Sequence, residues 1–421
     1  MSKIKQIWSR QILDSRANPT VEVACILDSG SYVVASVPSG ASTGTHEALE
    51  LRDRDPNYYM GKGVLKAVEN INTTLNTAVS GMDPSKQFEI DQKIIALDGT
   101  PNKTKLGANA ILGVSLVVAK AAAVDQHMQP FRWIENLAKS LTIPTSVHLP
   151  TPIFNMINGG LHGAGNLDFQ EFHVIPATSR PFSEALRSGV EIYHGLGETL
   201  VKKGAIHSVG DEGGYAPNLF TNADALEILI EAITFSKYSL GREVFLGLDV
   251  AASTFFDGGV YTIRDKSTPL DENALIEYYK SLNDQYHLAI LEDPLEQDQW
   301  AGWAKLTEIL GKSVTVVGDD LLVTNITRVQ KAVKEKACNA ILVKPNQIGT
   351  ITETLNVIKV SKDAGLKIIV SHRSGETNDW FIADFAVGVG ADYVKFGAPD
   401  RGERVAKYNR LSAIDLELTA R

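Results

Sequence analysis

Cysteine is scarce in this chain, and positive charge is not in excess. Its 421 residues include two cysteines, Cys25 and Cys338, which lie far apart in the sequence. This spacing argues against a disulfide framework and a cysteine-based zinc site, and it favours a reducing, cytoplasmic setting. The formal net charge is −9. Because nucleic acids and anionic membranes attract basic surfaces, neither is expected as the primary partner.

Long uninterrupted apolar runs are lacking too. The longest candidate, Ala108–Val124, contains Asn109, Ser115 and Lys120 and falls short of the ~20 apolar residues that a membrane-spanning helix needs. The first residues of the chain are not followed by an apolar core of signal-peptide length. We therefore expect no membrane insertion, and we predict a buried core helix at 108–124.

Signatures of nucleotide binding are also missing. Pro38–Gly44 is rich in small residues, but it has neither the lysine nor the spacing of a phosphate-binding P-loop. Its composition is more typical of a mobile lid. Gly388-Val-Gly390 lacks the third glycine of a dinucleotide fingerprint. No nucleotide cofactor is expected.

Residues 1–135 have the pattern of a small α+β domain. Two strands are predicted at Val21–Leu27 and Tyr32–Val37, joined by a turn that contains Gly30. The helical stretches that follow lie at about 63–79, 87–95 and 108–124.

A cluster of prolines marks the boundary of this domain. Pro144, Pro150 and Pro152 lie close together, and proline interrupts helices and favours extended connectors. We predict a cap domain at 1–135, which carries the 38–44 lid, and a second domain at 143–421.

The second domain alternates short apolar runs with helical intervals, and each run ends in a charged or polar group. The runs are Val244–Asp249, Leu288–Glu292, Val314–Asp319, Ala340–Lys344, Lys367–His372 and Tyr393–Lys395. Continuous apolar runs are typical of parallel strands that are buried on both faces. We therefore predict an α/β barrel, in which the residues at the carboxyl ends of the strands converge on one mouth.

Three carboxylates, Asp249, Glu292 and Asp319, end successive runs. Each one alone could be a solvent-facing residue or a helix cap, but three in successive units favour a metal site. Magnesium prefers oxygen ligands and commonly leaves positions for water and substrate, so this set suits it.

Two lysines, Lys344 and Lys395, also end apolar strands, where a lysine is costly unless it is paired or functional. Near a metal ion and another cation the pKa of a lysine falls, which would make it usable as a general base. Either lysine alone could be a surface residue.

Further polar groups belong to the predicted mouth. Arg373 and Ser374 follow His372, and a guanidinium binds phosphate or carboxylate through two donors, although Arg373 could instead form an internal salt bridge. Gly210–Gly214 is predicted to be a sharp turn that presents Glu212. Glu212 is a candidate site residue only if this turn faces the same mouth.

Four motifs together resemble those of the enolase family. They are Ser-Gly-Ala-Ser-Thr-Gly at 39–44, Gly-Asp-Glu-Gly-Gly-Tyr-Ala-Pro-Asn at 210–218, Asn-Gln-Ile-Gly-Thr at 346–350 and Ser-His-Arg-Ser-Gly-Glu-Thr at 371–377. The similarity runs from Asp14-Ser-Arg16 to Val405–Asn409 and so covers nearly the whole chain. Several long motifs in the right order make the resemblance specific.

The resemblance implies an α+β cap followed by a modified (β/α)8 barrel. It implies reversible dehydration of 2-phosphoglycerate to phosphoenolpyruvate with two magnesium ions per active site, in a homodimer or octamer. A lysine base that works with one or two magnesium ions is the established pattern of this superfamily rather than a deduction from these residues. By motif, Asp249, Glu292 and Asp319 hold the higher-affinity ion, and Ser42 on the lid helps to hold the second.

The same resemblance assigns the remaining roles. Lys344 takes the proton from C2, and Glu212 assists departure of the C3 hydroxyl. The residues predicted to bind the substrate are His162, Gln170, Glu171, His372, Arg373, Ser374 and Lys395.

Four positions depart from the family pattern. Ala17 stands where a glycine usually follows Asp-Ser-Arg, Pro345 follows the predicted base, and Phe396 replaces a threonine after the second lysine. Ala413 occupies a place where the family often has an arginine that pairs across the dimer with the residue matching Glu22.

Two other functions are compatible with such a fold. An acid-sugar dehydratase or racemase would usually lack the Ser-His-Arg-Ser segment and the Gly-Asp-Glu-Gly-Gly turn. A scaffold or surface-binding protein without catalysis would be favoured by loss of a metal carboxylate or of Lys344. Every such position is filled, so catalysis is the primary prediction.

Overall fold

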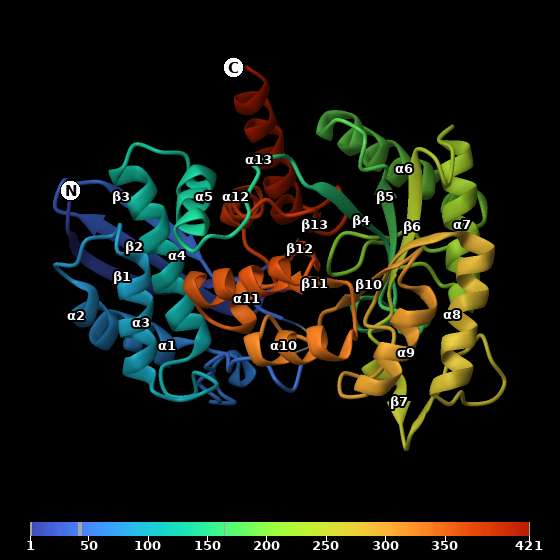
Figure 1. Cartoon of the computed structure of the whole chain (residues 1–421), viewed down its shortest axis with the longest axis horizontal. Coiled ribbons are helices and arrows are strands. Elements are labelled where there is room, and N and C mark those ends of the chain that lie inside the picture. Colours follow the sequence, from blue (N-terminus) through green and yellow to red (C-terminus); the bar gives the residue numbers. More distant parts are fainter. Residues whose placement is uncertain (1, 41–43, 164, 421) are drawn as a thin grey trace.

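The computed structural model describes residues 2–40, 44–163 and 165–420. Within them the chain folds into a cap and a barrel that lie side by side, with the amino terminus at the outer edge of the cap (Figure 1). The predicted combination of an α+β cap and a modified α/β barrel is confirmed.

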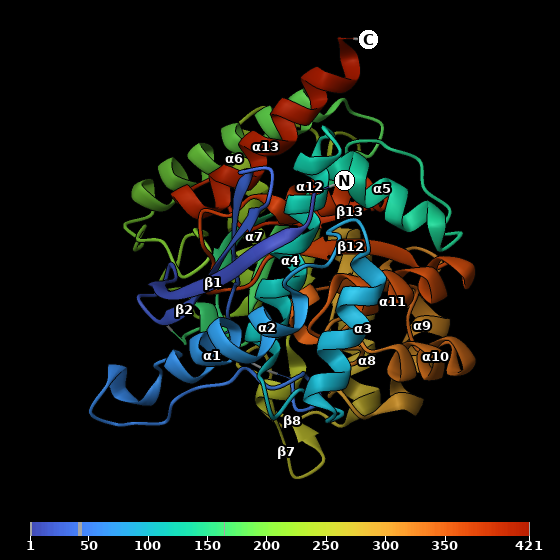
Figure 2. The ribbon, with the colours of Figure 1, turned by 90° about the vertical axis from the view of Figure 1, so that its left-hand side faces the viewer.

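The cap contains a three-stranded antiparallel sheet of β1 (Ile4–Leu13), β2 (Pro19–Leu27) and β3 (Tyr32–Ser36). Figure 2 shows this sheet beside the cap helices. The helices and helical segments are α1 (Leu65–Asn70), a π-helical segment (Ile71–Leu75), α2 (Asn76–Val79), α3 (Gln87–Asp98), α4 (Ala108–Asp125) and α5 (Pro130–Ser140).

Helix α4 is the core helix predicted at 108–124. By length and composition it is apolar enough to cross a membrane, but 83% of it is buried inside the protein. It packs against β2 and β3. A Cβ atom at Gly113 would lie 2.5 Å from Val23 Cγ2, so the absence of a side chain there allows this close approach.

The barrel closes in the strand order β10-β11-β12-β13-β4-β5-β6-β9. Its strands are β4 (Thr151–Asn158), β5 (Glu171–Pro176), β6 (Val244–Asp249), β9 (Leu288–Glu292), β10 (Thr315–Gly318), β11 (Ala340–Val343), β12 (Lys367–Ser371) and β13 (Tyr393–Lys395). β5 runs antiparallel to both of its neighbours. Its first residue, Glu171, therefore pairs with Asp249, the last residue of β6.

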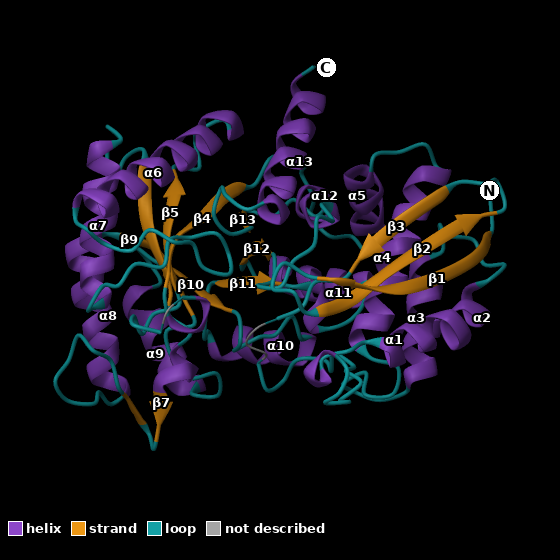
Figure 3. Ribbon diagram, turned by 180° about the vertical axis from the view of Figure 1, so that it is seen from behind, coloured by secondary structure: helices purple, strands orange, loops and turns teal. Residues whose placement is uncertain are grey.

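Helices surround these strands, as Figure 3 shows. They are α6 (Phe182–Lys202), α7 (Asn222–Phe235), α8 (Glu272–Tyr286), α9 (Trp300–Leu310), α10 (Ile326–Glu335), α11 (Ile351–Asp363), α12 (Phe381–Gly388) and α13 (Gly402–Thr419). A short hairpin, β7 (Phe256–Asp257) and β8 (Val260–Tyr261), precedes α8.

Cap and barrel share a buried polar junction at the amino terminus of α11. Asp91 Oδ2 accepts hydrogen bonds from the backbone N–H of Thr352 at 3.0 Å and from its hydroxyl at 2.5 Å. Ser115 Oγ accepts the N–H of Ile351 at 3.0 Å. These first N–H groups have no partner inside their own helix, so the cap supplies their acceptors.

Candidate active site

The strand ends bring the predicted residues to one cavity. Asp249, Glu292 and Lys395 end their strands, while Asp319 and Lys344 directly follow theirs. The predicted residues that line the cavity are His162, Gln170, Glu171, Glu212, Asp249, Asp319, Lys344, His372, Arg373, Ser374 and Lys395. Glu292 is buried against Lys395. Ser42 lies outside the described residues.

Lys395 is surrounded by carboxylates. Its Nζ donates to Asp249 Oδ2 at 2.8 Å and to both oxygens of Glu292 at 2.9 Å, and it lies 3.4 Å from Glu171 Oε2. Burial opposes the ammonium form, but Asp249, Glu171 and Glu292 outweigh it and hold the pKa of Lys395 well above its usual value. Lys395 is therefore a fixed positive charge.

Lys344 forms a short ion pair with Asp319 Oδ2. Although burial lowers the pKa of Lys344, Asp319 raises it more, and the net shift is upward. The protein groups alone therefore do not lower this pKa, and the fall expected beside a bound metal ion stays a prediction. Gln347 Nε2 donates to Asp319 Oδ1 at 2.9 Å and fixes the other side of the carboxylate.

Asp319 belongs to a tight acidic group with Asp293 and Asp320, whose ligand atoms lie within 4.8 Å of one another. Burial, Asp320 and Asp319 hold the pKa of Asp293 well above its usual range, and burial and Asp319 raise the pKa of Asp320 to about 7. Burial and Asp249 likewise raise the pKa of Glu292. Crowded, buried carboxylate oxygens of this kind suit a hard divalent cation.

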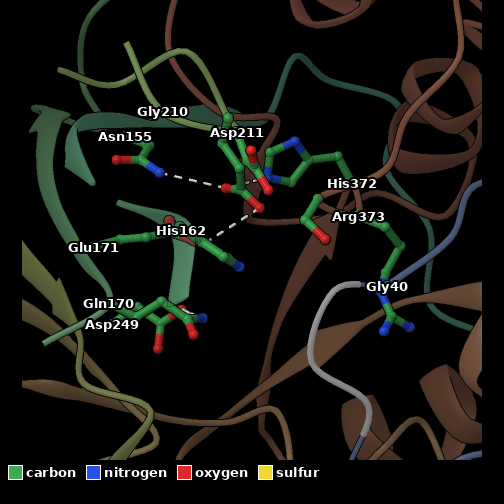
Figure 4. Close-up of polar contacts among 12 residues, drawn as sticks. Gly40, Asn155, His162, Gln170, Glu171, Gly210, Asp211, Asp249, His372 and Arg373 are labelled. Atoms are coloured by element: carbon green, nitrogen blue, oxygen red, sulfur yellow. Dashed lines mark hydrogen bonds and ion pairs between the residues drawn. The ribbon is translucent and has the colours of Figure 1, made fainter. Parts of the chain in front are cut away.

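Glu171 connects two histidines. Its Oε1 lies 3.1 Å from His162 Nδ1, and its Oε2 lies 2.8 Å from His173 Nε2. Burial opposes ionisation, but Lys395 and the two histidines hold the pKa of Glu171 well below its usual range. The anionic carboxylate only accepts hydrogen bonds, so both histidines donate to it. Figure 4 shows His162 and Glu171 on the side of the site opposite Arg373.

Glu212 lies between His162 and His372, at 3.5 Å and 3.0 Å. Asn155 Nδ2 donates to Glu212 Oε2 at 3.3 Å, a contact drawn in Figure 4. Burial lowers the pKa of His162, but the Glu212 and Glu171 carboxylates raise it above its usual value. For His372, burial and Arg404 lower the pKa.

These shifts indicate which histidine carries the positive charge beside Glu212. Arg404 Nη1 donates to His372 Nδ1 at 2.7 Å, which requires a lone pair on that nitrogen and so a neutral ring. Of the two rings, His162 is the one whose pKa the neighbouring carboxylates raise toward the charged form. Gln170 completes this side of the site, because its Nε2 donates to Asp249 Oδ2 at 3.3 Å.

Arg373 forms the internal salt bridge that was the alternative to anion binding, yet it also lines the cavity. Its Nη1 and Nη2 lie 2.9 and 3.2 Å from the two oxygens of Glu47. Nη1 also donates to Asn346 Oδ1 at 3.1 Å. Arg404 fixes the backbone of Ser374, because its Nη2 donates a hydrogen bond to the Ser374 carbonyl at 2.6 Å.

Several residues of the site were missed in the sequence. They include Glu47, Asn155, His173, Asp293, Asp320 and Gln347. For His173 a signal existed, because it lies two positions after Glu171 on one strand and so shares its face. Gln347 belongs to a quoted motif, whereas nothing local connects Glu47 with Arg373.

The departures from the family pattern have structural consequences. Ala17 keeps a left-handed backbone with φ 58°, which glycine adopts without strain. Pro345 begins a single helical turn, Pro345–Gln347, where a missing N–H costs nothing. Phe396 is fully buried. Glu22 is paired within the chain to Arg10 at 2.6 Å.

Comparison with protein families agrees with this geometry. Residues 4–134 match the enolase N-terminal domain, and residues 146–421 match the enolase C-terminal TIM barrel domain. The two matches together span nearly the whole chain. This chain belongs to the enolase family.

Proposed function

We propose that this chain is a magnesium-dependent hydro-lyase that reversibly converts 2-phospho-D-glycerate to phosphoenolpyruvate. The observation that carries the proposal is the convergence of Lys344, Glu212 and Arg373 on one cavity. They supply a base, an acid partner and an anion-binding group within reach of one small molecule. Membership of the enolase family supports a lyase.

Asp249, Glu292 and Asp319 would hold one magnesium ion in this proposal, and Ser42 would contribute to a second. Two observations support such a site: Asp249 and Glu292 are buried side by side against Lys395, and Asp319 belongs to a group whose ligand atoms lie within 4.8 Å of one another. Bound magnesium supplies positive charge beside the substrate carboxylate, where removal of the neighbouring proton adds further negative charge.

Lys344 takes the C2 proton as a neutral amine. Burial and Arg373 lower the pKa of Lys344, and Asp319 is the largest of the effects that raise it. Neutralising Asp319 therefore favours the amine. Lys395 keeps its proton because Glu171, which is not among the proposed metal ligands, lies 3.4 Å from its Nζ and raises its pKa. Its charge stabilises the substrate carboxylate as negative charge develops.

The acid step uses a pair of residues rather than Glu212 alone. Burial opposes ionisation of Glu212, but His372 and His162 hold its pKa at about 2. The proton therefore resides on His162 and reaches the hydroxyl by way of Glu212. The electron pair of the C2–H bond becomes the second C2–C3 bond, and the C3 oxygen leaves as water.

Arg373 and Ser374 would bind the phosphate. Arg373 is held in place by Glu47 and Asn346, so its guanidinium is oriented before the substrate arrives. Orientation before binding reduces the entropy that binding must offset.

We also propose a cytoplasmic homodimer or octamer. Two buried, unbonded cysteines support a reducing compartment. Leu13 and Trp380 are exposed and line one groove, which supports a contact surface there. Light scattering on the purified chain tests this, and a monomer at micromolar concentration would refute it.

The catalytic proposal is tested by the ultraviolet absorbance of the enol phosphate formed from 2-phosphoglycerate. We expect turnover with magnesium, none with chelator, and a loss of about 10²–10⁴-fold in Lys344→Ala. Lys312→Ala, at an exposed lysine, is the matched control and should retain full activity. Folded, magnesium-loaded protein without turnover would overturn the proposal and favour a binding or scaffold role.

A further inference from the structure

Strand β5 places a buried histidine directly beneath the cavity. Residues two apart on a strand share a face, so Glu171, His173 and Ile175 point the same way. Glu171 lines the cavity, and Ile175 belongs to the apolar cluster of strand residues that includes Ile153 and Ile290. His173 lies between these layers and is fully buried.

His173 is held by a single strong contact. Its Nε2 lies 2.8 Å from Glu171 Oε2, while Nδ1 has no hydrogen-bond partner among the described residues. Burying a polar ring costs free energy unless its polar atoms are hydrogen-bonded, so the bond from Nε2 to Glu171 offsets part of the cost of burying this one. Because Glu171 is an acceptor only, the ring carries its proton on Nε2.

This bond fixes the orientation of Glu171. The oxygen that His173 binds also lies 3.4 Å from Lys395 Nζ, and the other oxygen lies 3.1 Å from His162 Nδ1. A carboxylate tethered at one oxygen alone could rotate toward the ammonium. With both oxygens held, Glu171 keeps an acceptor in place for the Nδ1–H of His162, and the same nitrogen lies 3.5 Å from Glu212 Oε1.

The neighbouring strand repeats this arrangement. Asn155 on β4 stands opposite His173 in the strand register, and its Nδ2 donates to Glu212 Oε2. His173 and Asn155 therefore each support one of the two carboxylates beside His162. Supporting hydrogen bonds of this kind tune the groups that they orient.

We propose that His173 is a positioning residue that acts through Glu171 to fix the orientation of His162 and the hydrogen bond that its Nδ1–H donates to Glu171. The kinetic part of this inference rests on the proposed function. The structural part does not, because the hydrogen bond of His162 can be observed without turnover.

Two variants of similar size distinguish loss of the hydrogen-bond donor to Glu171 from loss of side-chain volume at position 173. His173→Gln places an amide N–H near the position of Nε2, whereas the side chain of His173→Asn is too short to reach Glu171. Histidine labelled with ¹⁵N in the magnesium-loaded protein reports the Nδ1–H of His162, assigned by comparison with His162→Gln. Thermal unfolding of each variant controls for loss of fold.

We expect His173→Gln to retain the Nδ1–H resonance and turnover within about threefold. His173→Asn should lose the resonance, and its kcat should fall by about 10–100-fold, with a smaller change in KM. If His173→Asn does not fold, His173→Met is the second variant without a donor.

Equal behaviour of the Gln and Asn variants, whether both normal or both impaired, would overturn the proposal. So would a retained His162 resonance in a folded variant without a donor. If the unmodified protein shows no turnover, the proposed function fails, and the resonance comparison still decides the role of His173.

Discussion

Replacing Asp91 by asparagine should remove a large pH dependence from the stability of the protein. Asp91 is fully buried, and burial raises its pKa to about 6 against hydrogen bonds from Thr352, Ser115 and Gln87 that lower it. Its carboxylate is therefore destabilised by burial at neutral pH. Asparagine keeps an acceptor for Thr352 and carries no charge.

The magnitude follows from the shift in pKa. Because the folded pKa exceeds the usual 3.8, the stabilising contribution of Asp91 is full below pH 3.8 and is lost as the pH rises through about 6. A shift of roughly two units corresponds to about 3 kcal/mol in total. Roughly half of it, about 1.5 kcal/mol, falls between pH 5 and pH 8.

Urea unfolding of both proteins across that range is the assay. The difference between the free energies of unfolding of Asp91→Asn and of the unmodified protein should shift by about 1.5 kcal/mol in favour of the variant as the pH rises. Parallel curves for the two proteins would refute the reasoning, because they would show that the folded pKa of Asp91 is not raised to about 6.

Three further predictions concern the backbone, the anion site and the metal site. Ala17→Gly should raise the free energy of unfolding by about 1 kcal/mol, because alanine resists the left-handed conformation that it has here. Ala413→Gly, on the exposed face of α13, is the control and should lower the free energy of unfolding by about 1 kcal/mol. Similar effects of the two substitutions in urea unfolding would contradict this. Arg373→Lys should raise the KM for 2-phosphoglycerate by about 10–100-fold, since a lysine cannot make two parallel bonds, and an unchanged KM in steady-state kinetics would exclude Arg373 from phosphate binding. Magnesium at one hundred times its Kd should stabilise the protein by about 3 kcal/mol in thermal unfolding. Chelator and Asp319→Asn should each remove this stabilisation. If magnesium still stabilises Asp319→Asn to the same extent, the ion binds elsewhere.

Much of the barrel could be predicted because its strands are locally distinctive. Apolar runs such as Ala340–Val343 are buried throughout, and such runs are typical of strands covered on both faces. In contrast, β1 was missed, since a bulge between Ile4 and Gln6 disturbs its alternation. β4 begins with Thr151-Pro152, and proline argues against a strand.

The sequence by itself determined which residues stand at the strand ends, and therefore that Asp249, Asp319 and Lys395 meet at one mouth. Only the tertiary structure decided the direction of β5, which places Glu171 in that mouth at the start of its strand rather than at the end. It also decided that Glu47 of the cap would hold Arg373 of the barrel. Periodicity reports burial along a single segment, whereas strand direction and ion pairing depend on how distant segments close around a common core.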